Sequence, residues 1–305
     1  MEKIDIHLHL GVEDFIRNPA GGRGEKVTYV SGTTPHPVQA KMSGALEMLP
    51  HLKELGISQG ILLSSGESGE TGTSNPQVRQ AAALAPDVYR WMCNVDPKEP
   101  DTLPVRLAQY KEQGAVGIGE FMINEWIDSP FIESAFSAAE AVNLPILFHM
   151  GPEAGFNYGI ADHPGLPLLE AALGRHPELT FIGHSQPFWH EISRDAQPDS
   201  KSRNSWGEGP VTPGGRLIQL FDRFPNLYGD LSANSGGNAI MRDEEFGLKF
   251  LETYQDRLMF GTDMTNTDSY FPLGGWLDKQ FGQGNLSSSV YQKICRENAK
   301  RIFGL

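Results

Sequence analysis

Two histidines separated by a single residue lie almost at the start of the chain, at the end of the run KIDIHLH over residues 3–9. The run is rich in β-branched and apolar residues, which predicts a strand. Because side chains alternate along a strand, His7 and His9 should face the same way and could bind one metal ion between them. The opposite face would then carry Ile4, Ile6 and Leu8. An isolated pair of this kind also arises by chance, so the rest of the chain has to decide.

Four further polar side chains end short apolar runs that read as strands. They are Glu120, His149, His184 and Asp263. An unpaired charge or imidazole beside a hydrophobic core is costly, so such groups are normally paired or bound to a metal. Together with the two N-terminal histidines, they form a candidate metal site.

The elements that would position these side chains alternate regularly. Residues 11–41 are irregular and rich in Gly, Pro and Thr, and strand-like and helix-like runs follow in turn. The predicted strands are 3–9, 57–65, 89–95, 115–121, 145–150, 179–184, 227–231 and 258–263. The predicted helices include 45–55, 75–85, 166–175, 215–224, 243–254 and three that end at residues 113, 142 and 303. Eight such units predict an α/β fold, a single (β/α)8 TIM barrel spanning residues 1–305, with an open doubly wound sheet as the alternative.

The connections differ at the two ends of the predicted strands. Helix-to-strand joins are tight, whereas long strand-to-helix loops cover 10–41, 151–164, 185–214 and 264–285. In a barrel these long loops all lie over the C-terminal mouth, where enzymes of this fold keep their active sites.

Composition narrows the functional classes. Of the 305 residues, 39% are hydrophobic and 21% are charged, and the net charge is −13. These values exclude disorder and argue against nucleic acid as a partner. There is no apolar run of about 18 residues and no basic-then-apolar leader, so we expect a cytoplasmic protein that acts on a small-molecule substrate away from membranes. Cys93 and Cys295 are expected as reduced, buried thiols. Whether the chain forms a homo-oligomer is open.

The ordered set of polar residues resembles the amidohydrolase superfamily, and within it the amidohydrolase-2 branch of hydrolases and non-oxidative decarboxylases. In that branch the first strand supplies His-x-His, the fifth and sixth strands each supply a histidine, and the eighth supplies an aspartate. The segment ENAKRIF over residues 297–303 is also similar to this branch. The resemblance implies one or two divalent metal ions, usually zinc, held by His7, His9, His149, His184 and Asp263.

Glu120 departs from the pattern of many two-metal members, which carry a carboxylated lysine at the end of strand four. The resemblance implies that a glutamate can bridge two ions. His7, His9 and Asp263 would then hold one ion, and His149 and His184 the other. With a single ion, His149 would join the first site and His184 would orient substrate or move protons. Glu120 could also be an ordinary salt-bridged carboxylate.

The expected chemistry follows from these ligands. A divalent cation bound by imidazoles and a carboxylate lowers the pKa of its water to about 7 and polarises a carbonyl oxygen. Asp263 could then serve as general base and afterwards as general acid. We therefore expect a metal-dependent hydrolase acting on a lactone, ester or amide, and the alternatives are a decarboxylase of the same branch or a barrel that binds without turnover.

Further polar residues near the predicted strand ends have open roles. The loop 185–214 could be a lid whose arginine binds a substrate carboxylate, or it could be a surface or subunit contact. Its candidate residues are Trp189, His190, Arg194, Arg203 and Trp206. Substrate contacts or structural roles at the rim are equally open for Ser65, Glu67, Asn94, Asp96, Asp230, Ser232 and Asn234.

Overall fold

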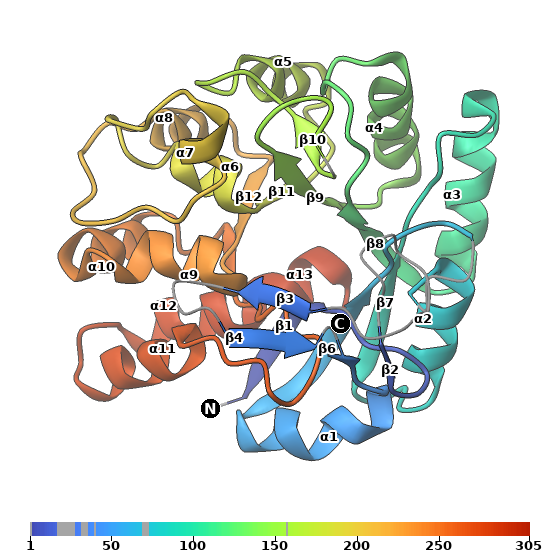
Figure 1. Ribbon diagram of the computed structural model, residues 1–305, viewed down its shortest axis with the longest axis horizontal. Helices are drawn as coiled ribbons and strands as arrows, with labels where there is room; N and C mark the ends of the chain where they lie inside the picture. The colour runs from blue at the N-terminus through green and yellow to red at the C-terminus, as the bar shows by residue number, and fades with distance from the viewer. Residues whose placement is uncertain (1, 17–27, 32–35, 40, 69–72, 157) are drawn as a thin grey trace.

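The computed structural model describes residues 2–16, 28–31, 36–39, 41–68, 73–156 and 158–305. Eight parallel strands form a ring, and helices surround it (Figure 1). In ring order the strands are β1 (Lys3–Leu8), β6 (Ile57–Leu63), β7 (Tyr89–Cys93), β8 (Ala115–Phe121), β9 (Ile146–Gly151), β11 (Phe181–His184), β12 (Leu227–Asp230) and β13 (Leu258–Met259). The predicted TIM barrel is confirmed, and the open sheet is wrong.

Backbone hydrogen bonds join the last strand of the ring to the first. Ile6 N donates to Phe260 O at 3.2 Å, and Asp263 N donates to His7 O at 2.8 Å. Strand β13 covers only the first two residues of the predicted strand 258–263, but the residues that follow it still run alongside β1. This closure brings His7, near the start of the chain, next to Asp263, near its end.

Most helices lie where the amphipathic pattern predicts them. These are α1 (Ala45–Glu54), α2 (Asn75–Ala83), α3 (Leu103–Glu112), α4 (Pro130–Val142), α5 (Pro167–Arg175), α8 (Arg216–Arg223) and α10 (Glu244–Thr253), and the last helical stretch comprises α12 (Ser288–Gln292), the π-helical turn η2 (Lys293–Glu297) and α13 (Asn298–Phe303). Helix α4 shows why the boundaries were readable. Ser129 caps its N-terminus by accepting a hydrogen bond from Ile132 N, and it ends at Asn143 in the left-handed conformation.

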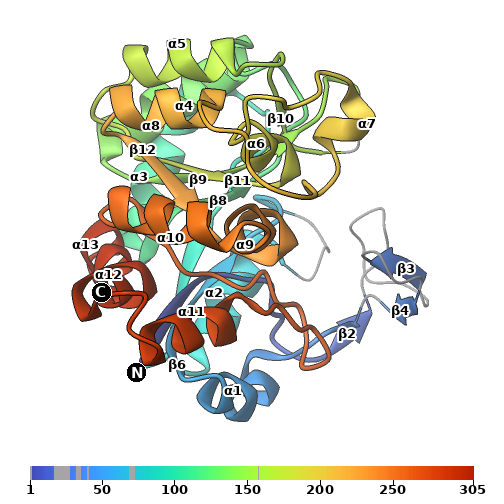
Figure 2. The same cartoon turned by 90° about the vertical axis from the view of Figure 1, so that its left-hand side faces the viewer.

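The long loops contain elements that the sequence did not predict. Within the described part of residues 11–41, β2 (Phe15–Ile16) pairs with β5 (Lys41–Met42) and β3 (Thr28–Ser31) pairs with β4 (His36–Gln39), both antiparallel. Residues 17–27, 32–35 and 40 of that stretch lie outside the described residues. Figure 2 shows β3 and β4 standing off one end of the barrel. The other additions in the long loops are β10 (Ile160–Ala161), α6 (Gln186–His190), α7 (Ser200–Arg203) and α11 (Leu273–Gly282), and η1 (Pro100–Thr102) and α9 (Ala233–Met241) lie in shorter connections.

Two apolar layers hold the barrel together. The inner cluster takes side chains from most strands of the ring, including Ile4 and Ile6, whereas the outer cluster fills the space between the strands and the helices. Leu8 belongs to the outer cluster, so the predicted single face of Ile4, Ile6 and Leu8 is wrong. The pairing of β1 with β6 shifts register between Asp5 and Leu8, and such an irregularity re-aims the side chains beyond it. No helix in the described ranges is long and apolar enough to cross a membrane.

Candidate metal centre

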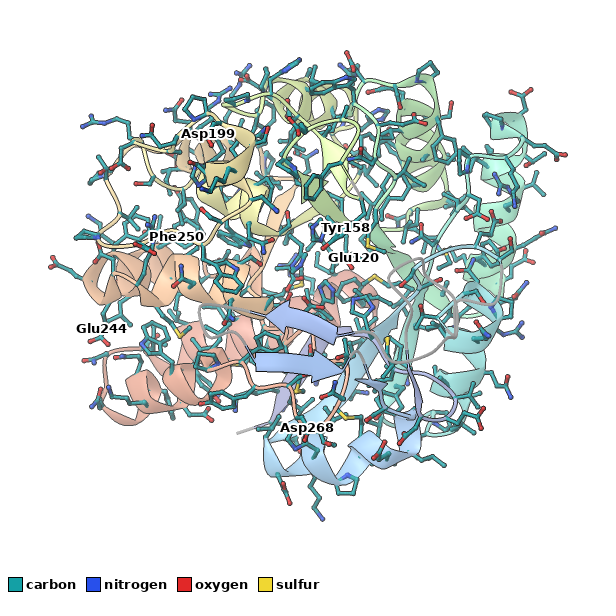
Figure 3. The ribbon with its side chains drawn as sticks, viewed as in Figure 1. Glu120, Tyr158, Asp199, Glu244, Phe250 and Asp268 are labelled. Carbon is teal, nitrogen blue, oxygen red and sulfur yellow. The ribbon has the colours of Figure 1, made fainter. Side chains whose placement is uncertain are left out.

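All six predicted site residues converge at the C-terminal mouth of the barrel. His7 and His9 come from the end of β1, Glu120 from β8, His149 from β9 and His184 from β11, and Asp263 follows β13. Figure 3 shows Glu120 near the centre of the ring. Their convergence follows from the fold, because parallel strands end on the same side of the barrel.

The tightest group is formed by His7, His9 and Asp263. The Nε2 atoms of the two histidines lie 3.1 Å apart, and Asp263 Oδ1 lies 3.4 Å from each of them. Glu120 Oε2 lies 3.7 Å from His7 Nε2 and 3.3 Å from His9 Nε2. A tetrahedral zinc ion with bonds of about 2.1 Å needs donors about 3.4 Å apart. These residues fit such an ion in both donor type and spacing.

A second group shares His7 with the first. His7, Glu120 and His184 each offer a ligand atom, and these atoms lie within 4.8 Å of one another. His184 Nε2 is 3.8 Å from Glu120 Oε1 and 4.0 Å from Asp263 Oδ2. Among the described residues His149 belongs to neither group. Its Nδ1 instead lies 2.6 Å from Glu120 Oε1, so its role as a ligand stays a prediction.

Asp230 supports two of the histidines from behind. Its Oδ2 lies 2.7 Å from His7 Nδ1 and 3.1 Å from His184 Nδ1. The Ser232 hydroxyl lies 3.2 Å and 3.0 Å from the same two nitrogens and donates to Asp230 Oδ2 at 2.8 Å. A carboxylate acceptor keeps the proton on Nδ1, which leaves the lone pair of each Nε2 facing the centre.

The charges of the centre favour a bound cation. Burial lowers the pKa of His7, but the carboxylates of Asp263 and Asp230 outweigh it and hold that pKa well above its usual value. Burial raises the pKa of Glu120, yet the neighbouring His149 and other imidazoles bring it well below its usual value. Glu120 and Asp263 lie against the Nε2 atoms, and Asp230 lies behind two of the imidazoles. Together these carboxylates stabilise positive charge in the group, whether it is a proton on an imidazole or a metal ion.

Asp5 and Thr262 fix the backbone beneath this centre. Asp5 Oδ1 accepts hydrogen bonds from His7 N and Thr262 N, both at 3.0 Å, and its Oδ2 accepts one from Thr262 Oγ1 at 2.5 Å. One buried carboxyl group thus joins the strand that carries His7 to the segment that carries Asp263. Asp263 itself has a left-handed backbone (φ 64°), which aspartate tolerates better than most residues.

Close packing at the mouth needs a glycine. A Cβ atom on Gly261 would lie 2.9 Å from Asp230 Oδ1, 2.9 Å from Ser232 Cβ and 3.3 Å from His7 Cβ. Only glycine lets this segment pack so closely against Asp230 and Ser232.

The residues with open roles mostly serve the scaffold. Asn94 Nδ2 donates to Ser64 O and Glu120 O, which ties three strand ends together. Glu67 accepts from Tyr110 Oη at 3.0 Å and pairs with Arg106.

The candidate residues of the loop 185–214 have different positions and roles. The buried Arg203 donates through Nη1 to Pro152 O and Asp162 O, so it anchors the loop to the segment after β9. Arg194 is exposed, and Asn234 lies in the first turn of α9. Trp189, His190 and Trp206 line a pocket together with residues of α9.

Sequence reasoning missed the supporting roles of Asp230 and Asp5. Asp5 precedes the two histidines with the same spacing of two, so an acidic residue in a strand buried on both faces was an available signal. From the sequence, Asp230 could be recognised only as a polar residue at the end of a predicted strand. Its partners His7 and His184 come from other strands, so the contacts could not be predicted without the closed barrel.

The family model described as amidohydrolase matches residues 66–305 of this chain. The chain belongs to the amidohydrolase family. The matched part contains Glu120, His149, His184 and Asp263, whereas His7 and His9 lie before it and are placed by the structure alone. No curated protein matches this amidohydrolase.

Solved structures of similar fold include hydrolases and decarboxylases. A probable 2-pyrone-4,6-dicarboxylic acid hydrolase from Acinetobacter baumannii, with citric acid bound, is 14% identical with a TM-score of 0.58, over 100% of both chains. An uncharacterized TIM-barrel protein from Bordetella bronchiseptica is 17% identical with a TM-score of 0.63, over 100% of this chain and 99% of that one. A dihydroxybenzoic acid decarboxylase from a Polaromonas species, with bound manganese and 2-nitroresorcinol, is 18% identical with a TM-score of 0.52, over 84% of this chain and 85% of that one. At these identities the likeness shows the fold.

Proposed function

We propose that this amidohydrolase is a metal-dependent hydrolase that cleaves a C–O or C–N bond in a small lactone, ester or amide. The observation that carries the proposal is the group formed by His7 Nε2, His9 Nε2 and Asp263 Oδ1, whose mutual distances are 3.1 to 3.4 Å. These residues, with Glu120 as the fourth donor, would hold one ion, for which zinc suits the mixture of imidazole and carboxylate ligands.

The cation, when bound, supplies Lewis acidity that polarises a carbonyl group and lowers the pKa of a water molecule. Asp263 is the general base in this proposal. Its side chain is 28% exposed, more than those of His7 and His9, so it can meet both the ligand group and an incoming water. Asp263 accepts the proton of the attacking water and then passes it to the leaving oxygen or nitrogen.

His184 would act on the substrate rather than on the water. Asp230 and Ser232 hold its Nδ1, and its Nε2 faces the same space as Asp263 Oδ2 at 4.0 Å. From that position it can hydrogen-bond the carbonyl oxygen on which negative charge develops.

A second candidate, non-oxidative decarboxylation, is favoured by the state of His149. Its Nδ1 lies 2.6 Å from Glu120 Oε1, and its side chain is 12% exposed. Among the described residues it belongs to neither ligand group. Burial lowers the pKa of this imidazole, but Glu120 favours its protonated form, and that form could deliver the proton that replaces the departing carboxylate on carbon. The manganese-containing decarboxylase of the same fold makes this a reaction to test.

The test is a substrate panel on protein stripped with a chelator and then reloaded with zinc or with manganese. The proposal predicts hydrolysis of at least one lactone, ester or amide by the zinc-loaded protein and none by the stripped protein. Release of carbon dioxide from an aromatic acid, without hydrolysis of any panel member, would replace the hydrolase with the decarboxylase.

A further inference from the structure

Tyr158 lies on the loop that follows β9, and its ring packs against a residue of the candidate site. The centroids of the Tyr158 and His149 rings are 4.7 Å apart, and the two planes are tilted by 58°. His149 Nδ1 in turn lies 2.6 Å from Glu120 Oε1. Figure 3 shows Tyr158 beside Glu120 near the centre of the ring. The tyrosine therefore belongs to the wall of the site at the barrel mouth.

Tyr158 is more open to solvent than the two site residues it adjoins. It is 45% exposed, whereas the side chains of His149 and Glu120 are 12% and 6% exposed. Phe156, whose ring centroid lies 6.5 Å from that of Tyr158, extends the aromatic surface. Covering an exposed aromatic ring with another apolar surface is favourable, so a substrate that reaches the metal centre can gain binding energy here.

The loop that carries Tyr158 is tied to the barrel at several points. Asn124 Nδ2 donates to Gly159 O, and Asn124 Oδ1 accepts from Gly155 N, both at 2.7 Å. A Cβ atom on Gly159 would lie 2.4 Å from Gly151 N, so glycine lets the backbone after Tyr158 pack directly on the end of β9. The backbone position of Tyr158 is thus set before a ligand arrives, which lowers the ordering cost of binding.

We propose that Tyr158 determines substrate specificity by packing against a flat, conjugated group of the substrate. The inference rests on the proposed function, since the reacting carbonyl would lie at the metal centre while the flat group extends over Tyr158. Aromatic rings pack favourably in offset or tilted pairs with centroids about 4.5 to 7 Å apart.

The position of Tyr158 also limits where this flat group can be attached. Only His149 and Glu120 lie between the tyrosine and the group formed by the two N-terminal histidines and Asp263. The flat group should therefore begin at the carbonyl carbon or at the atom next to it. The substrate class is then an ester, lactone or amide whose carbonyl is conjugated with a ring.

Two hydroxamates with the same metal-binding group test this inference. Benzohydroxamate carries a flat ring, whereas cyclohexanecarbohydroxamate carries a puckered ring with the same number of carbon atoms. Calorimetry on the zinc-loaded protein gives the ratio of the cyclohexyl Kd to the phenyl Kd. This ratio should fall about 2- to 10-fold in Tyr158→Ala, as expected for the loss of one aromatic pair, and Tyr158→Phe, which keeps the ring, should retain the wild-type ratio.

The ratio is a readout that a merely structural role of Tyr158 would not change. If the tyrosine only held His149 in place, both hydroxamates would lose affinity by the same factor. Tyr270→Ala is the matched control and should keep the wild-type ratio, because Tyr270 is also an exposed tyrosine, at 76%, and has no ring contact with the site histidines in the described part of the chain.

An equal Kd ratio in wild type and a folded, zinc-loaded Tyr158→Ala would overturn the inference. So would a ratio that falls as far in Tyr158→Phe as in Tyr158→Ala. The ratio is measured on zinc-loaded protein whether or not that protein hydrolyses an ester, so a failure of the hydrolase assay is distinguishable from a failure of the role of Tyr158.

Discussion

His7 Nδ1 lies 2.7 Å from Asp230 Oδ2, and both side chains are fully buried. The pair explains how a histidine near the start of the chain keeps one orientation at the mouth of the barrel. Since the carboxylate can accept the Nδ1 proton, it is Nε2 that faces His9 and Asp263, and Nε2 would lose its proton when a metal ion binds. Asp230 therefore sets the chemistry of the centre without being one of its proposed ligands.

Replacing Asp230 by asparagine should weaken metal binding. Supporting carboxylates of metal-bound histidines typically contribute about 10- to 100-fold in affinity, and Asp230 supports both His7 and His184. A competition titration with a chromophoric chelator measures the change. Asp87→Asn, at an exposed position, is the control. Equal metal affinity in Asp230→Asn and wild type would remove the supporting role.

Asp263→Asn should separate metal binding from turnover. The amide keeps an oxygen that can face the ion but cannot take a proton, so most of the metal should remain while kcat falls by about 10²- to 10⁴-fold. Metal content and kcat are measured on the same preparation. Asp268→Asn serves as the control, because Figure 3 places Asp268 well away from Glu120. A variant that loses its metal and its activity together would make Asp263 a ligand without a separate role as base.

Asp162 should make stability depend on pH between about 4 and 6. Burial raises the pKa of this carboxyl to about 6, although its oxygens accept hydrogen bonds from Leu168 N and Leu169 N at the start of α5. A raised folded-state pKa gives stability that is complete below the unfolded value near 4 and is lost as the pH rises through 6. Urea unfolding at several pH values should show this fall, on the order of 3 kcal/mol, reduced in Asp162→Asn. Identical pH slopes in the two proteins would contradict the assignment.

The two cysteines should be unreactive in the folded protein. Cys93 and Cys295 are free and buried, and burial raises the pKa of the Cys295 thiol to about 12 and that of Cys93 as well. Because the thiolate is the reactive form, an aromatic disulfide reagent should label neither thiol under native conditions and both in denaturant. Fast labelling of either one without denaturant would show that its surroundings open readily.

Most of the fold could be predicted from the sequence, because the apolar residues of strands and of helices recur with different periods and the two kinds of element differ in length. The run 115–121 was predicted and observed with the same bounds, since Gly114 ends the preceding helix and the strand is continuously apolar up to Glu120. The strand pairs β2–β5 and β3–β4 were missed because pairs of two to four residues leave no periodic pattern. That residues 1–305 form one domain remains a prediction, and a single urea transition would support it.

The candidate ligands were readable for a different reason. A histidine or carboxylate that ends an apolar run, as His149 and His184 do, marks the mouth of a barrel whatever the exact pairing. What could not be read was how these groups face one another. The link between His149 and Glu120 and the shared support of His7 and His184 by Asp230 join residues far apart in sequence, and they depend on the closed ring.

The most direct test of the account is the metal stoichiometry of the purified protein, measured by inductively coupled plasma mass spectrometry after reloading with zinc and removal of free ion. Wild-type protein and His163→Ala, a control histidine outside both ligand groups, should retain one ion per chain, and His7→Ala/His9→Ala should retain none and show no hydrolysis. A double variant that kept its ion, or wild-type protein that hydrolysed its substrate at full rate after complete chelation, would contradict the proposed centre.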